Sequence, residues 1–263
     1  MPRPVWVLLR GLSRESGHWG PFVPALAAAL PEARILPLDL PGTGSRLSER
    51  SPRSMRGIME KTREAPELRS STDGPVFLFG LSLGGMVAME WAARHASELA
   101  GAIIAASSTS DVAPLWKRFS PRAILDIGLG LFDPDPMRRH ERSARLLLNR
   151  KDLRKDAIRL WAQIERERPI TRGTLRAQMM AAGDYRAPDA IDVPLRFLVG
   201  AKDRLVDADC SRILAKRYGA PLSAHPEAGH DLTTDATEWV VREVVQFHRA
   251  VEDRQAAERR YEG

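Results

Sequence analysis

The sequence predicts an α/β fold, in which a mostly parallel sheet of about six strands is flanked by helices and carries one inserted helical segment. Two observations predict it. Short apolar runs alternate with helical stretches over residues 1–110 and again over 187–263, which is typical of a parallel sheet. Between them, residues 111–186 show helical patterns broken by prolines and no convincing strand. We therefore expect a core of residues 1–110 and 187–263, with residues 111–186 inserted as a helical cap or lid.

The strands are predicted from short apolar runs that are followed by turn-forming residues. They cover residues 5–9, 35–38, 76–79, 101–106, 195–199 and 221–224. Helices are predicted where apolar residues recur at helical spacing, over residues 19–30, 54–64, 86–95 and 238–251. The charged tail, residues 252–263, is expected to fray.

The composition is that of an ordinary globular protein with a sizeable core. The chain has 263 residues, of which 43% are hydrophobic. No run approaches the roughly 18 apolar residues of a membrane span, and no secretory segment precedes the first strand, so a cytoplasmic location is expected. The single cysteine, Cys210, excludes an internal disulfide and a cysteine-based zinc site.

The net charge of +6 raises the question of a nucleic-acid partner. Most of the basic excess falls between residues 111 and 192, where acidic residues are interspersed. Residues 150–168 alternate in sign at helical spacing, which indicates a solvated helix face. With no nucleic-acid motif present, we expect no such partner. A basic cap that docks an acidic carrier protein or a carboxylated substrate stays open, although a solvated surface is favoured over it.

One serine stands where a buried strand breaks into a helix. Gly80-Leu81-Ser82-Leu83-Gly84 matches G-x-S-x-G, and it lies between the strand of residues 76–79 and a helical pattern that begins at Met86. The turn is tight, so the positions two before and two after the serine must lack side chains. It exposes Ser82 Oγ and leaves the Leu83 N–H free at a helix N-terminus, where negative charge is favoured. Ser82 is therefore the predicted nucleophile.

A serine hydroxyl needs an adjacent base and a carboxylate that orients the base. His230 follows the last short strand and is the favoured base among six histidines; His225 is the rival, expected to point away from the pocket. Asp203 follows the fifth predicted strand and so emerges at the same sheet edge as Ser82. Asp207 lies four residues later and is better explained as a helix cap.

A second backbone donor for a developing oxyanion is expected from the loop after the first strand. That loop reads Arg10-Gly11-Leu12. Gly11 permits the turn, and the Leu12 N–H would join that of Leu83.

Together these motifs resemble the α/β-hydrolase fold superfamily, and within it small serine esterases with a helical cap, including the pimeloyl carrier-protein methyl ester esterases. The resemblance rests on residues 10–19, on Asp39-Leu40-Pro41-Gly42-x-Gly44, and on the segments around Ser82, Asp203 and His230. It covers nearly the entire chain outside the middle segment and names no substrate.

Two departures from that pattern stand out. Family members usually carry histidine before the oxyanion glycine, where this chain has Arg10. A structural salt bridge is favoured for Arg10 over attraction of an anionic substrate group. The chain also starts directly at the first parallel strand, so the antiparallel strands that often precede it are expected to be absent or reduced.

The resemblance implies acyl transfer from a small or medium ester to water, with no metal or organic cofactor. Candidate substrate contacts are Arg10, His18, Trp116 and Trp161, the tryptophans as part of an apolar acyl pocket in the cap. Aromatic residues at helical spacing are more often cap core. An acyltransferase or thioesterase of the same fold, or a catalytically silent ligand-binding member, stays an alternative; retention of all three triad residue types argues against the last.

Overall fold

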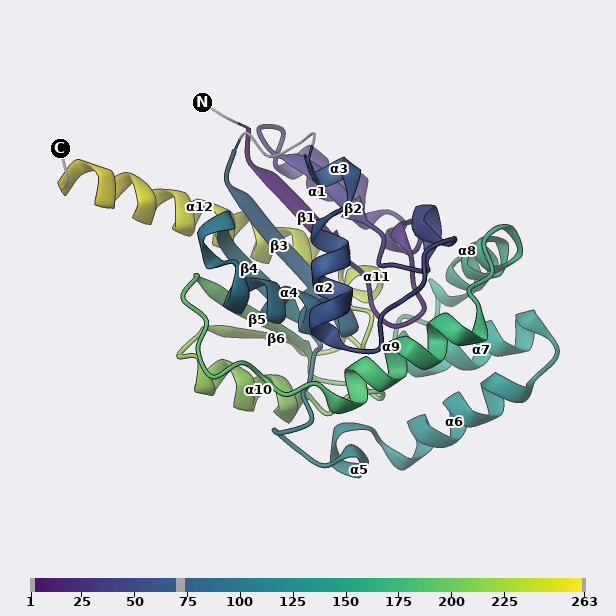
Figure 1. Cartoon of the computed structure of the whole chain (residues 1–263). Coiled ribbons are helices and arrows are strands. Elements are labelled where there is room, and N and C mark those ends of the chain that lie inside the picture. Colours follow the sequence, from purple (N-terminus) through teal and green to yellow (C-terminus); the bar gives the residue numbers. More distant parts are fainter. Residues whose placement is uncertain (1–2, 70–73, 262–263) are drawn as a thin grey trace.

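The computed structural model of the chain describes residues 3–69 and 74–261, and it is built on one six-stranded sheet (Figure 1). Every pair of neighbouring strands is parallel, and the strand order is β2-β1-β3-β4-β5-β6. The strands are β1 (Val5–Leu9), β2 (Arg34–Leu38), β3 (Val76–Leu81), β4 (Leu99–Ala105), β5 (Leu195–Gly200) and β6 (Leu222–His225). All six predicted strands are confirmed.

Helices cover both faces of the sheet, because parallel strands that lie in the interior are apolar on both sides. On β1, Val5, Val7 and Leu9 join one apolar core, whereas Trp6 and Leu8 join the other. The first core is closed by α2 (Met55–Arg63), α4 (Leu83–Arg94) and α10 (Ala208–Arg217). The second is closed by α1 (Phe22–Ala29), α11 (Leu232–Asp235) and α12 (Thr237–Tyr261). The short helix α3 (Pro66–Arg69) follows α2.

Residues 111–186 are helical. They form α5 (Leu115–Arg118), α6 (Pro121–Phe132), α7 (Pro136–Leu147), α8 (Arg154–Glu167) and α9 (Arg172–Asp184), which lie together at one end of the molecule (Figure 1). The segment contributes one isolated β-bridge, between Phe119 and Val206, and no strand of the sheet. Its interpretation as a separate cap stays a prediction.

Two predicted helices differ in extent from the structure. The helix expected over residues 19–30 begins at Phe22, because Gly20 has a φ of +50° and Pro21 follows it. A short 3-10 turn, Ser16–Trp19, precedes this break. The prediction of a frayed tail is wrong for the described residues: α12 continues to Tyr261 and projects beyond the sheet (Figure 1). After Val251 the chain consists largely of good helix formers, such as Glu, Arg, Gln and Ala.

The turn between β3 and α4 is held by close backbone packing. Ser82 has a φ of +59°, a left-handed conformation that side-chain-bearing residues adopt at a cost. A Cβ on Gly80 would lie 2.3 Å from the carbonyl oxygen of Gly84, and a Cβ on Gly84 would lie 2.0 Å from that of Leu9. Both positions therefore require glycine. The second contact presses the start of α4 against the end of β1.

We expect Gly84→Ala to lower the free energy of unfolding by about 3 kcal/mol or more, because neither backbone segment can move away without breaking the sheet. Urea denaturation measures the loss. The control is Gly183→Ala, since a Cβ at this helical position meets no atom within 4 Å. It should change stability by less than about 1 kcal/mol. Equal stability of the two variants would contradict the packing argument.

Candidate active site

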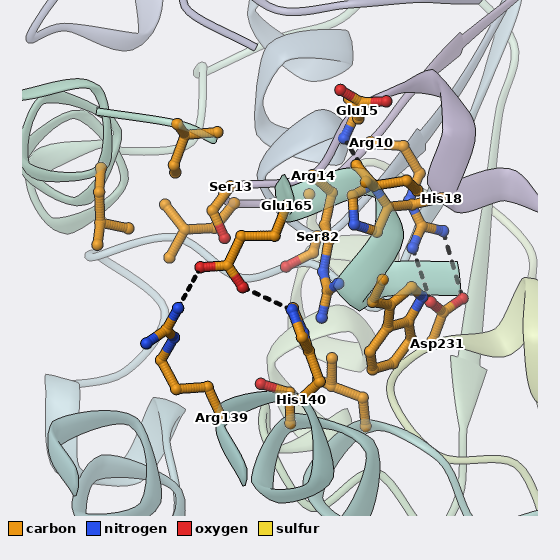
Figure 2. A pocket seen from close by; sticks show the side chains of 18 of the residues that line it. Arg10, Ser13, Arg14, Glu15, His18, Ser82, Arg139, His140, Glu165 and Asp231 are labelled. Atoms are coloured by element: carbon orange, nitrogen blue, oxygen red, sulfur yellow. Dashed lines mark hydrogen bonds and ion pairs between the residues drawn. The ribbon is translucent and has the colours of Figure 1, made fainter. Parts of the chain in front are cut away.

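A pocket of about 500 Å³ lies next to Ser82 (Figure 2). Its walls come mainly from the loop after β1, the helices α7 to α9 and the loop that precedes α11. The β3–α4 turn, α6 and the loop after β5 add Leu81 and Ser82, Asp126 and Leu205, respectively. The residues that define it are Arg10, Leu12, Arg14, His18, Ser82, Arg139, His140, Trp161, Glu165, Arg168, Leu175, Met179, His230 and Asp231. The loops after β1 and β3 leave the sheet at its carboxyl edge, where open parallel sheets bind ligands.

Ser82 is half-buried and its backbone is fixed on both sides. Its N–H donates to the carbonyl oxygen of Ala105 at 2.8 Å, and its own carbonyl oxygen accepts from Ser107 Oγ at 2.9 Å. The backbone N–H and C=O groups of Ser82 are thus both hydrogen-bonded by residues at or just after the end of β4, and the side chain lines the pocket (Figure 2).

His230 and Asp203 form a buried pair behind the pocket. His230 Nδ1 lies 2.7 Å from Asp203 Oδ2, and both side chains are buried. The other carboxylate oxygen, Oδ1, accepts from the N–H groups of Leu205 and Val206. The carboxylate is therefore held in one orientation, and its bond to Nδ1 leaves Nε2 of His230 for a second partner. Within the described chain no hydrogen bond joins His230 to Ser82, although both line the same pocket.

The rival candidates lie elsewhere. His225 Nδ1 accepts from the N–H groups of Glu227 and Ala228, and its ring packs edge-on against Trp239. Asp207 caps α10 by accepting from the Asp209 N–H at 2.9 Å. Neither residue lines the pocket beside Ser82.

The predicted oxyanion donors flank the serine. A Cβ on Gly11 would lie 3.2 Å from Ser82 Cβ, so the loop after β1 passes directly by the serine. Leu12 lines the pocket, and Leu83 is the first residue of α4. Neither amide N–H donates to a protein acceptor among residues 3–69 and 74–261. Both are therefore available as donors.

The loop after β1 is also tied to the helical segment. The Ser13 N–H donates to Gln178 Oε1 of α9 at 2.9 Å. The buried carboxylate of Glu15 accepts from Nε and Nη2 of Arg168, which lies just after α8. These bonds fix the loop position relative to α8 and α9.

Arg10 has a structural role. Its guanidinium binds both carboxylate oxygens of Asp231, at 2.7 and 3.3 Å, and also Thr233 Oγ1, and it stacks on Trp19. Burial alone would raise the pKa of Asp231, but the charge and hydrogen bonds of Arg10 lower it to about 2. Arg10 borders the pocket with its charge already matched, as the favoured sequence interpretation holds.

Of the other predicted substrate contacts, His18 and Trp161 line the pocket and Trp116 does not. The His18 pKa is lowered well below its ordinary value by burial and by the charges of Arg14 and Arg10, so its ring is neutral. Trp161 is fully buried. Trp116 is 69% exposed, because the one-turn helix α5 turns Arg118 rather than the tryptophan inward.

Arg14 lines the pocket but is not predicted from the sequence. Its guanidinium lies over the Trp161 ring, 4.0 Å from the ring centre, inside the pocket (Figure 2). The signal in the sequence is its place two residues after Leu12, in the loop that carries the oxyanion donor. The chain has 40 lysine and arginine residues, so this position did not stand out.

Residues 6–243 match the sequence model of a family described as the alpha/beta hydrolase family. This chain belongs to the alpha/beta hydrolase family. The predicted fold class and the prediction of a hydrolase are therefore confirmed, whereas the cleavage of carboxylic esters stays a prediction. A curated relative, the biotin biosynthesis bifunctional protein BioHC of Teredinibacter turnerae, is 33% identical over 107 residues. That match covers 40% of this hydrolase and 18% of the longer relative.

Solved structures share the hydrolase fold at low sequence identity. The esterase RhEst1 of Rhodococcus sp. superposes with a TM-score of 0.76 at 20% identity, over 95% of this chain and 91% of that one. A putative non-heme bromoperoxidase of Mycobacterium tuberculosis gives 0.74 at 22% identity, over 95% and 93%. An enol-lactonase of Burkholderia xenovorans gives 0.73 at 19% identity, over 94% and 92%.

Two further properties of the chain concern metal ions and membrane spans. The described part of the chain holds no group of three or more His, Cys, Asp or Glu residues that could bind a metal ion. None of the helices in the described ranges is long and apolar enough to cross a bilayer.

We expect Asp231→Asn to lower the free energy of unfolding of the hydrolase by about 3 kcal/mol at neutral pH, because Arg10 is left as a buried cation without a partner. The folded-state pKa of Asp231 is about 2 against an ordinary value of 3.8. Ionised Asp231 therefore stabilises the fold above pH ~4, and this contribution is lost as the pH falls toward ~2. The difference between wild type and variant should shrink over the same range.

Urea denaturation at graded pH measures this difference. The matched control is Asp152→Asn, because the pKa of Asp152 is also lowered to about 2, by its hydrogen bond to Arg150, but that pair is exposed. The control should show little change in stability. A cost of Asp231→Asn that stayed constant with pH would rule out the ion pair as its cause.

Proposed function

We propose that the protein is a carboxylic-ester hydrolase that acts through Ser82, His230 and Asp203 on an ester with a small or medium acyl group. One observation carries the proposal: Ser82 stands on a strained strand–helix turn in the same pocket as His230, whose Nδ1 is bound to the buried Asp203. A buried carboxylate on Nδ1 sets the tautomer in which Nε2 can accept a proton.

In the proposed acylation, Ser82 Oγ attacks the ester carbonyl carbon and its proton passes to His230 Nε2. The carbonyl oxygen becomes an oxyanion, which accepts from the N–H groups of Leu12 and Leu83. Asp203 stabilises the imidazolium that forms. His230 then gives its proton to the alkoxide as the carbon–oxygen bond breaks, and the alcohol leaves an acylated Ser82.

In the proposed deacylation, water attacks the acyl carbon and gives its proton to His230 Nε2. The second oxyanion collapses, the bond to Ser82 Oγ breaks, and His230 returns the proton to that oxygen. The products are a carboxylic acid and free enzyme. No step of this sequence uses a metal or an organic cofactor.

The pocket supports a substrate of modest size. Its volume of about 500 Å³ falls within the range of small-molecule sites. Trp161, Leu175 and Met179 supply apolar wall from α8 and α9. We accordingly propose residues 111–186 as the cap that closes the pocket. An acyltransferase or thioesterase would use the same residues and would differ in the group that attacks the acyl-enzyme or leaves from it.

An acidic carrier protein is not part of this proposal. Several arginines of residues 111–186 are already paired with acidic neighbours, and such pairs leave a mixed rather than a basic surface. The pairs are Arg138–Asp135, Arg139–Glu165, Arg150–Asp152 and Arg159–Asp156.

We expect wild-type protein to hydrolyse p-nitrophenyl esters and to be labelled by an alkyl fluorophosphonate on Ser82. Ser82→Ala should abolish labelling and lower kcat by about four to six orders of magnitude, because the proposed nucleophile is removed. Mass spectrometry locates the label, and circular dichroism checks that the variant folds. Wild-type protein that neither labels nor hydrolyses any ester in a series of graded acyl length would overturn the proposal.

We expect His230→Gln to lower kcat by about four orders of magnitude, because the base is lost while the pocket is kept. Asp203→Asn should lower kcat by a similar factor, because asparagine would no longer hold His230 in the tautomer with the proton on Nδ1. His225→Gln is the control, since His225 lies outside the pocket. Comparison of kcat across the three variants tests the assignment. Loss of activity in His225→Gln alone would transfer the role of base to His225.

A further inference from the structure

Arg14 places an unpaired cation inside the catalytic pocket. Its side chain extends from the loop after β1 into the space that Ser82 and His18 also line (Figure 2). One face of its guanidinium covers the Trp161 ring, at 4.0 Å from the ring centre. Within residues 3–69 and 74–261 its side chain makes no hydrogen bond or ion pair with a protein group, and only its backbone N–H is paired, with the carbonyl oxygen of Gly11. The edge of the guanidinium that carries its N–H groups is therefore free for a ligand.

The acidic groups of the pocket form no ion pair with Arg14, because other side chains bind them. Asp231 is bound to Arg10 on both oxygens, and Glu15 is bound by Arg168. Glu165 lies between Arg139 and His140, at 2.5 and 2.6 Å (Figure 2).

Two other lining residues complete the charge pattern. Arg172 also borders the pocket but is exposed, so water solvates its charge. Asp126 lies at the rim and has Arg122 as its neighbour at 3.8 Å. Arg14 is thus the half-buried cation of the pocket that has no carboxylate partner in the described part of the chain.

The unpaired charge of Arg14 also affects the pKa values of neighbouring groups. Burial and the charge of Arg10 lower the pKa of Arg14 to about 10, although the charges of Asp231 and Glu165 act to raise it; Arg14 is therefore protonated at neutral pH. Burial and then Arg14 lower the pKa of His18 and also that of His140. A ligand anion would give the half-buried Arg14 a charge-assisted hydrogen-bond partner in place of pocket water.

We propose that the hydrolase acts on esters that carry a carboxylate apart from the scissile ester group, and that the Arg14 guanidinium binds this carboxylate. This inference rests on the proposed function. A planar guanidinium with one face on a tryptophan presents its edge, which matches the two oxygens of a carboxylate. One guanidinium balances one negative charge, so the expected ester carries a single carboxylate.

His18 contributes a neutral donor to the same pocket. Its Nδ1 accepts from the Glu15 N–H at 3.1 Å, so the ring proton resides on Nε2. The neutral His18 Nε2–H can donate to an oxygen of a bound carboxylate without adding a second positive charge.

The test compares matched pairs of esters. One series consists of p-nitrophenyl monoesters of straight-chain dicarboxylic acids of graded length, each paired with the ester in which the terminal carboxylate is a carboxamide. A second series places the charge on the alcohol, as 4-carboxyphenyl and 4-carbamoylphenyl esters. The readout is the ratio of kcat/KM for the charged ester to kcat/KM for its neutral partner. A general loss of activity cancels in this ratio.

We expect wild-type protein to prefer the charged ester by about tenfold or more in at least one pair. Arg14→Gln should remove that preference, and Arg14→Lys should restore part of it, because lysine keeps the charge but not the planar fork. The control is Arg166→Gln, which removes the same charge from the exposed surface of α8. It should keep the wild-type ratio.

Three outcomes would overturn the inference. They are the absence of any charged-ester preference in wild type, an unchanged ratio in Arg14→Gln, and an equal loss in Arg166→Gln. In each of them neutral esters are still hydrolysed, so the proposed function survives. Absence of hydrolysis and of Ser82 labelling would instead remove the proposed function.

Competition distinguishes a carboxylate from a phosphate. Glutarate should inhibit hydrolysis of a neutral ester more strongly than inorganic phosphate does, and Arg14→Gln should weaken that inhibition by about tenfold. Stronger inhibition by phosphate that Arg14→Gln abolishes would replace the carboxylate with a phosphate group.

Discussion

The contact between Gly84 and the carbonyl of Leu9 is the constraint on which the site depends. It brings the start of α4 against the end of β1, closer than any side chain would permit. The loop that follows β1 must then pass beside Ser82, and Gly11 lies within van der Waals reach of the serine side chain. Two backbone segments that are distant in the sequence thereby bring the N–H groups of Leu12 and Leu83, which find no protein acceptor among the described residues, near one hydroxyl.

A buried ion pair holds the two halves of the site together. Arg10 precedes Gly11, and Asp231 follows His230, so the bond between Arg10 and Asp231 links the loop of the proposed oxyanion donor to the loop of the proposed base. Desolvation makes such a pair expensive, and its benefit lies in fixing one arrangement of the two loops. Arginine can fill this role because its fork binds both carboxylate oxygens at once.

The sequence predicts the sheet and the candidate catalytic residues because their signals are local. An apolar run marks each strand, and Gly80 to Gly84 marks the turn that carries Ser82. The remainder depends on long-range contacts. The partner of Arg10 lies 221 positions away, so no local pattern distinguishes the paired Arg10 from the unpaired Arg14. Trp116 and Trp161 both occur in helical patterns, and only the packing of the helices decides that one is exposed and the other buried.

The loop after β1 gathers several roles in a few residues. Leu12 offers an amide to the site, Ser13 and Glu15 anchor the loop to Gln178 and Arg168, and Arg14 carries the unpaired charge between them. Arg14 and the Leu12 amide are therefore carried by the same short segment. Its anchors, Arg168 and Gln178, lie just after α8 and on α9, so these helices fix the position of the segment. The proposed carboxylate contact and the proposed oxyanion donor thus lie on one short segment, residues 12–15, which is anchored at Ser13 and Glu15.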